Sequence, residues 1–216
     1  MADNITLPAT GTGTATPVAA TDDIAGLHYQ RIKLVHGVDG TNAGDVATTN
    51  PFPVAPYTAI IRAQTDVTRP ADTAVYAAGD AISDSTTAPT TGGFTFTNAA
   101  RKSGGSGIII AATFSSSNDP ATRLSGELFI FDQAVTAIND NAAFAVSDAE
   151  IKTLAGVVPF SLFDAGNNGF CAVNNIAIPF VCVGTANLRF LLRARNAYTP
   201  ASGEVITCTI YVQPGD

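Results

Sequence analysis

Two dense apolar runs near the middle of the chain constrain the fold more than any other feature. The first run covers residues 108–114 and the second covers 128–131, with the polar segment Ser115–Pro120 between them. Short runs of β-branched and aromatic residues bounded by turn-forming residues predict β-strands. Neither run alternates cleanly, so we expect both faces of each strand to be covered. The two strands should then be central strands of a packed sheet.

The last two predicted strands, residues 187–195 and 205–213, alternate most clearly. Because side chains alternate between the two faces of a strand, one apolar set from each should face the core. The expected core residues are Leu188, Phe190, Leu192, Ala194, Ile206, Cys208, Ile210 and Val212. Arg189, Arg193 and Arg195 should form an outer face that pairs with carboxylates.

Other segments complete a set of roughly eight to ten strands at the spacing of a sandwich. The expected strands cover 27–35, 58–63, 72–77, 94–97 and 170–183, and 157–163 is expected to be extended. Asn168-Gly169 predicts a tight hairpin turn, and Pro179 predicts a bulge or a sheet edge. One short helix, roughly Asp148 to Ala155, should follow the capping box formed by Ser147 and Glu150.

The first part of the chain differs in composition from the rest. Residues 1–23 are rich in Thr, Ala, Gly and Pro, and residues 50–56 contain three prolines. Such segments bury too little apolar surface to offset the entropy of ordering. We therefore expect an all-β fold: an extended N-terminal arm with one strand over 1–56, then a jelly-roll-like β-sandwich with one short helix over 57–216.

Charge and hydropathy exclude several classes of function. Charged residues make up 13% of the chain, about half of the usual share, and the net charge is -7. Nucleic acid is therefore not an expected partner, because phosphate contacts need clustered Lys and Arg. No apolar run approaches the ~20 residues that span a membrane, and the polar, acidic start leads us to expect no secretory signal. A low-charge surface instead suits a protein held in a larger assembly.

The polar and sulfur-containing residues predict no catalytic residue, no metal and no cofactor. Cys171, Cys182 and Cys208 follow no metal-binding spacing, and we interpret them as buried thiols. A Cys171–Cys182 bridge is the alternative, and it requires an oxidising compartment. Calcium at residues 39–45 is a second alternative to a plain turn. A pair of glutamates from Glu127, Glu150 and Glu204 is not excluded as a glycosidase site, although capping and strand ends explain them better.

A candidate interface lies near the start of the chain. Tyr29, Arg31 and Lys33 share one face of the strand predicted over 27–35, and His28 and Phe52 lie nearby in sequence. The face is either solvated or docks on another subunit. Arginine is favoured at interfaces and lysine is not, so the pattern supports both interpretations.

Two stretches resemble virion structural proteins of tailed bacteriophages. One covers Ile24–Val54, and the other runs from Arg101 through Leu128–Asp132 and Asp140–Phe144 to Val158. The resemblance implies a capsid decoration (cement) protein with a β-sandwich body, an extended N-terminal region and no catalytic residues. It implies a homo-oligomer, a trimer at threefold sites, that binds the major capsid protein on the capsid surface after synthesis in the bacterial cytoplasm. The alternative is a tail, baseplate or fibre-adaptor component that binds carbohydrate.

Overall fold

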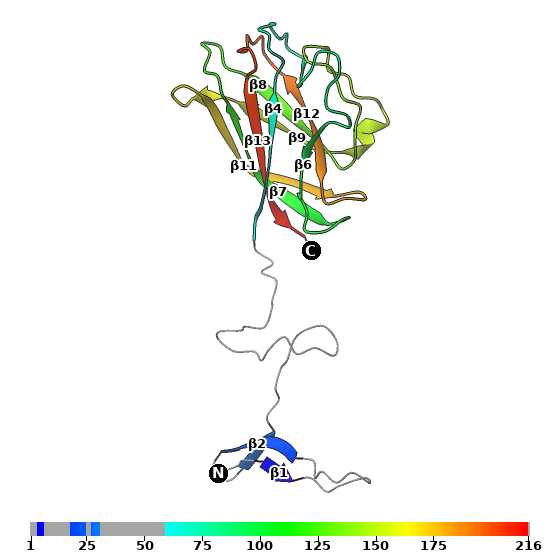
Figure 1. Cartoon of the computed structure of the whole chain (residues 1–216), viewed down its shortest axis with the longest axis vertical. Helices are drawn as coiled ribbons and strands as arrows, with labels where there is room; N and C mark the ends of the chain where they lie inside the picture. Colours follow the sequence, from blue (N-terminus) through cyan, green and yellow to red (C-terminus); the bar gives the residue numbers. More distant parts are fainter. Residues whose placement is uncertain (1–3, 7–17, 25–26, 31–58, 216) are drawn as a thin grey trace. The chain divides into compact units, whose positions relative to one another are not determined.

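The computed structural model describes residues 4–6, 18–24, 27–30 and 59–215 (Figure 1). Contacts divide the chain into two units, Met1–Ala55 and Pro56–Asp216. In the first unit, β1 (Asn4–Thr6), β2 (Val18–Ile24) and β3 (Leu27–Gln30) form an antiparallel sheet in that order. Residues 27–30 of the strand predicted over 27–35 are thus in a strand, and residues 31–35 lie outside the described residues.

The second unit contains two antiparallel sheets. Its strands are β4 (Ile61–Thr68), β5 (Ala81–Ile82), β6 (Phe94–Phe96), β7 (Ser106–Ser116), β8 (Ser125–Phe131), β9 (Leu154–Ser161), β10 (Phe163–Asp164), β11 (Gly169–Val181), β12 (Leu188–Ala194) and β13 (Val205–Pro214). The first sheet has the order β10-β11-β7-β13-β4, which places β13 (red) beside β4 (cyan) in Figure 1. The second sheet has the order β5-β12-β8-β9, and β6 also pairs with β12.

The path of the chain between these sheets is that of a jelly roll. If β5 is grouped with β6 and β10 with β11, every connection between successive strands crosses from one sheet to the other, except the β8–β9 connection. Each sheet then contributes four strands, the eight-stranded double sheet of jelly rolls. The predicted all-β, jelly-roll-like sandwich is therefore confirmed.

The core lies between the two sheets and is lined by the predicted residues of β12 and β13. All eight of these side chains are buried, at most 1% exposed. Aromatic rings join the sheets across the core: Phe114 of β7 stacks on Phe160 of β9, with 4.0 Å between ring centroids. Cys171, Cys182 and Cys208 are buried in this core with no disulfide among them, as the interpretation as buried thiols requires.

The two apolar runs that dominate the sequence form interior strands, but of different sheets. β7 lies in the middle of the first sheet and β8 lies between β12 and β9 in the second. The prediction that both faces of the strand are covered is confirmed for β8 and is wrong for β7. In β8, Leu128 and Ile130 enter the core while Phe129 and Phe131 enter a second apolar cluster. In β7, outward side chains such as Ile108 remain exposed.

The second cluster explains how the outer side of β8 becomes buried. Residues 132–149 cross the outer side of the second sheet, where Val135, Ile138, Phe144 and Val146 pack on side chains of β8, β9 and β12. The rings of Phe129 and Phe144 lie 4.6 Å apart. The loop therefore covers one outer face of the sandwich.

Three predicted elements are wrong in type or length. The strand predicted over 58–63 overlaps β4 only at residues 61–63, and β4 continues to Thr68. Residues 72–77 form no strand, and only Tyr76 makes an isolated bridge, to Tyr198. The Asp72 carboxylate accepts a bond of 3.0 Å from the Ala74 amide, which holds this segment in a turn. The helix predicted from Asp148 to Ala155 is a single 3-10 turn, Glu150–Thr153, because the chain from Leu154 onward pairs with β8.

The bulge and the edge predicted for β11 are confirmed, but the tight turn predicted at Asn168-Gly169 is wrong in position. The hairpin pairs Asp164 with Gly169, so the chain turns over residues 165–168 and Gly169 already belongs to β11. The register shifts between Asn174 and Ile178, as a bulge requires. Pro179 lies where β11 pairs with β7 on one side only, among the described strands. An edge position tolerates proline, because no neighbouring strand there needs the amide hydrogen that proline lacks.

The stacked pair across the core yields a prediction. Phe114→Ala should lower the free energy of unfolding by about 3–5 kcal/mol, because it removes the ring between the sheets and leaves a cavity. Phe163→Ala is the matched control: Phe163 is 67% exposed, so a change within about 0.5 kcal/mol is expected. Urea denaturation measures both, and equal losses for the two variants would contradict this description of the core.

Candidate interaction surface

The structure leaves the predicted N-terminal interface untested. His28 and Tyr29 belong to β3, but their side chains are not described. Arg31, Lys33 and Phe52 lie outside the described residues. The interface of these five residues therefore remains a prediction.

The predicted pairing of the arginine row, Arg189 and Arg193 of β12 and Arg195 just after it, is confirmed for two of its three members. Arg193 donates from Nε to the Glu127 carboxylate at 2.8 Å, and Arg195 Nε lies 3.5 Å from the same group. Arg189 instead donates to the hydroxyl of Thr95. The Arg193 guanidinium also lies 5.0 Å from the ring centroid of Phe129, under the covering loop. The Glu127 carboxylate is thus paired with the arginine side chains of Arg193 and Arg195.

The outer side of the first sheet has an unusual composition. Its three neighbouring strands β11, β7 and β13, of 13, 11 and 10 residues, contain no Asp, Glu, Lys or Arg. Alternation and register direct one set of their side chains away from the core. From β7 and β13 the outward residues are Ile108, Ala111, Thr113, Ser115, Thr207, Thr209, Tyr211 and Gln213, of which Thr209 is only 2% exposed. From β11 they are Phe170, Ala172, Asn174, Pro179 and Val181. We call this surface the neutral face.

The neutral face mixes hydroxyl, amide and apolar groups. Phe170 is 45% exposed and Val181 is 58% exposed, so large apolar side chains reach solvent there. Charges appear only on the flanking strands, such as Arg62 and Asp66 of β4 and Asp164 of β10. Exposed strands usually carry charges that oppose association, and their absence here marks a surface suited to contact with another protein.

A buried ion pair that sequence reasoning missed lies at one end of the sandwich. Arg69 Nη2 lies 2.9 Å from Asp140 Oδ2, and both side chains are fully buried. Asp140 Oδ1 accepts from the Tyr76 hydroxyl at 2.5 Å and from the Ser83 amide at 2.8 Å. Arg69 also donates to the Tyr76 hydroxyl. These bonds satisfy both charges and tie the covering loop to residues 69–83.

A second buried carboxylate continues this cluster. The ring of Tyr76 stacks on that of Tyr198 at 6.3 Å, and the Tyr198 hydroxyl donates to Glu204 at 2.5 Å. Glu204, which directly precedes β13, is 1% exposed and also accepts from the Ser116 hydroxyl. Burial raises the pKa of both tyrosines, so each stays a neutral donor. The cluster is enclosed and fits a structural role.

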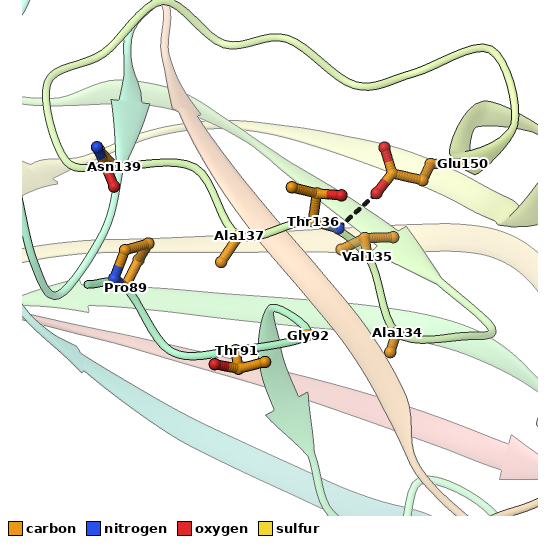
Figure 2. Close-up of a pocket in the computed structure, with 9 residues that line it drawn as sticks. All are labelled: Pro89, Thr91, Gly92, Ala134, Val135, Thr136, Ala137, Asn139 and Glu150. Carbon is orange, nitrogen blue, oxygen red and sulfur yellow. Dashed lines mark hydrogen bonds between the residues drawn. The ribbon is translucent and has the colours of Figure 1, made fainter. Parts of the chain in front are cut away.

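One surface hollow of about 510 Å³ lies between residues 89–92 and 134–139 (Figure 2). Its walls are mostly Pro, Ala, Gly and Thr, and its one ionisable side chain is that of Glu150. The Glu150 carboxylate accepts from the amides of Thr136 and Ser147 and from the Ser147 hydroxyl. The predicted capping contact between Ser147 and Glu150 is therefore present, and these bonds lower the pKa of Glu150 to about 2. A carboxylate held this way is a weak base.

Two searches of the described residues complete the survey. Within them, no three His, Cys, Asp or Glu side chains are grouped so that they could hold a metal ion. None of the helical segments in the same part of the chain is long and apolar enough to cross a bilayer.

Comparisons with known proteins yield distant structural matches alone. No family model and no curated protein matches the chain. A chain from a full particle of Israeli acute paralysis virus heated to 63 degrees has a TM-score of 0.30 and 10% identity, covering 97% of this chain and 95% of that one. A chain from the native virion of Kashmir bee virus has a TM-score of 0.28 and 12% identity, with coverages of 97% and 88%. A chain from a marine algae virus of the order Picornavirales has a TM-score of 0.24 and 12% identity, covering 97% of this chain and 92% of that one. At these TM-scores the likeness carries no argument about function.

The ion pair yields a stability prediction. Arg69→Met should lower the free energy of unfolding by about 3–5 kcal/mol, because it leaves Asp140 buried without its cation. Arg62→Met, at an exposed position of β4, is the control and should change it by less than about 0.5 kcal/mol. Chemical denaturation followed by circular dichroism tests this. A loss below about 1 kcal/mol for Arg69→Met would show that the pair does not anchor the loop.

The bonds to Glu150 yield a pH prediction. Because its folded pKa of about 2 lies below the ordinary 4.5, the carboxylate stabilises the fold above about pH 4.5. That contribution should disappear as the pH falls from 4.5 to 2. Carboxyl NMR titration should show the pKa of Glu150 rising toward 4.5 in Ser147→Ala and staying near 2 in the control Ser161→Ala. An unchanged pKa in Ser147→Ala would refute the assignment to the capping bonds.

Proposed function

We propose that this chain is a structural protein of a virus particle, a bacteriophage capsid decoration protein that binds the capsid surface and bridges capsomers. The observation that carries the proposal is the neutral face, three adjacent strands without a charge on an exposed side of a rigid sandwich. Such a surface is suited to permanent contact with protein. The proposal includes no catalytic activity.

The fold supports this role in combination with the neutral face. Jelly rolls form viral capsid domains, and they also form lectin and cupin domains. Function must therefore be argued from a surface or site and not from the fold. The carboxylates Glu127, Glu150 and Glu204 are each held by hydrogen bonds or ion pairs within the protein, which favours a structural role over hydrolysis.

The proposed partners are the major capsid protein and further copies of this chain, in a homotrimer, with no nucleic acid or membrane. In this proposal the segment Ile24–Val54, with Arg31 and Lys33, docks on the capsid shell, and the sandwich is carried on the virion surface. A protein that binds only the assembled shell stabilises it by mass action. Synthesis in the host cytoplasm is part of the same proposal.

One observation favours a second candidate, a tail or baseplate component that binds carbohydrate. Phe163 and Phe170 are directly paired across β10 and β11 and are both exposed. Phe170 borders a hollow of about 400 Å³ with Ser115, Ser117 and Asn168. Exposed aromatic side chains beside hydroxyl and amide groups can serve as a ligand platform.

Purified particles provide the test. We expect the protein on the capsid surface by immunogold labelling, and we expect Lys33→Glu to reduce binding of the full chain to stripped particles at least tenfold. Lys152→Glu, in the 3-10 turn, is the matched charge reversal and should bind as the wild type does. Detection at the tail tip alone, together with binding on a glycan array, would favour the second candidate. Absence from virions would contradict both.

A further inference from the structure

The two outer sides of the sandwich differ in whether another segment of the chain covers them. The outer side of the second sheet is covered by residues 132–149, which add their own apolar cluster. The outer side of the first sheet is the neutral face, where Ile108, Phe170 and Val181 are each more than 40% exposed. An exposed sheet face of this size without charges needs a physical explanation, since charges are the usual protection against association.

Charge restricts which partner suits this face. Each copy of the chain has a net charge of -7, so two copies repel one another over most approaches. Contact through β11, β7 and β13 brings no formal charge of one copy against the same charge of another. The neutral face is thus a described surface over which two copies can meet without opposing like charges at its centre.

The chemistry of the face also allows it to meet an identical surface. In a contact between like copies, the same groups often lie on both sides. Hydroxyls such as those of Thr113, Ser115 and Tyr211 donate and accept hydrogen bonds, as do the amides of Asn174 and Gln213. Such groups can pair with their own kind, whereas a basic or acidic patch would repel its copy.

The size of the face agrees with a stable contact. The three strands of the face, at about 4.8 Å spacing and with about ten residues at 3.4 Å each, cover roughly 14 by 34 Å, or about 490 Å². Standard interfaces bury about 800 Å² per partner, which is the same order. The neighbouring strand β4 carries Arg62 and Asp66, so charges lie at the rim and not at the centre.

We infer that the neutral face is a self-association surface and that its occupant is a second copy of this chain. This inference rests on the proposed function only in that both describe a component of an assembly. It assigns contact between copies to the sandwich and leaves shell binding to Ile24–Val54. Neutral contact between the sandwiches would let neighbouring copies join while each remains bound to the shell.

Sedimentation velocity of the full chain over a range of concentrations tests the inference. The wild type should form oligomers, and Thr113→Glu and Ala172→Glu should each weaken association at least tenfold, since both place charge at the centre of the face. Ala172→Lys should weaken it as well, although it lowers the net negative charge. Thr86→Glu, in an exposed loop, is the matched control and should associate as the wild type does. Circular dichroism melting confirms that each variant is folded.

Three results would overturn the inference. The first is a wild-type chain that is monomeric at every concentration. The second is normal association of the folded Thr113→Glu and Ala172 variants, which would place the contact between copies elsewhere. The third is normal association together with lost particle binding, which would make the shell the occupant of this face. Absence of the protein from particles would contradict the proposed function and leave the sedimentation result standing.

Discussion

The buried ion pair between Arg69 and Asp140 makes the two outer sides of the sandwich unlike. Asp140 belongs to the loop that crosses the second sheet, and Arg69 directly follows β4 of the first sheet. Backbone bonds from Ala81 to Ala142 and from Phe144 to Gly79 add to this attachment. Two charges out of water cost several kcal/mol unless they are paired and hydrogen-bonded, and the bonds to Tyr76 and Ser83 complete the pairing.

That attachment accounts for the distribution of surface types. With the loop fixed, Phe129, Phe131 and Leu191 are buried on the outer side of the second sheet. The first sheet has no such loop among the described residues, and its middle strands present hydroxyls, amides and isolated large apolar groups. The edge of this sheet at β11 is protected, although its face is not. The bulge near Asn175 and the missing amide hydrogen of Pro179 discourage another strand from joining β11. Association is therefore favoured through the face and opposed at this edge.

The parts of the fold that follow from local patterns could be predicted from the sequence. Alternation in β12 and β13 identified the residues of those strands that lie between the sheets but not Leu191, which is buried in the second cluster, and the proline of β11 identified its edge. The run 128–131 was correctly expected to be covered on both sides, but what covers it is a loop that ends about 20 residues later. The placement of β7 and β8 in one sheet was wrong because apolar runs do not specify which strands are partners.

The buried polar contacts could not be predicted for a related reason. Arg69 and Asp140 are 71 residues apart, and no local spacing signals their pairing. Glu204 has the same difficulty with Ser116 of β7, which is 88 residues away, whereas its other partner, Tyr198, lies six residues away in the same connection. The neutral face was visible in the sequence as long stretches without charge, but their adjacency in one sheet required the topology. The residues of the candidate interface at Arg31, Lys33 and Phe52 lie outside the described part of the chain.

Hydroxyl-radical footprinting across a concentration series tests the central claim most directly. If copies associate through the neutral face, oxidation of Phe170 and Tyr211 should fall as the concentration of the full chain is raised. Ile151, which is 47% exposed in the 3-10 turn, should be oxidised equally at all concentrations. Constant oxidation of Phe170 and Tyr211, in a sample whose sedimentation shows oligomers, would contradict the claim.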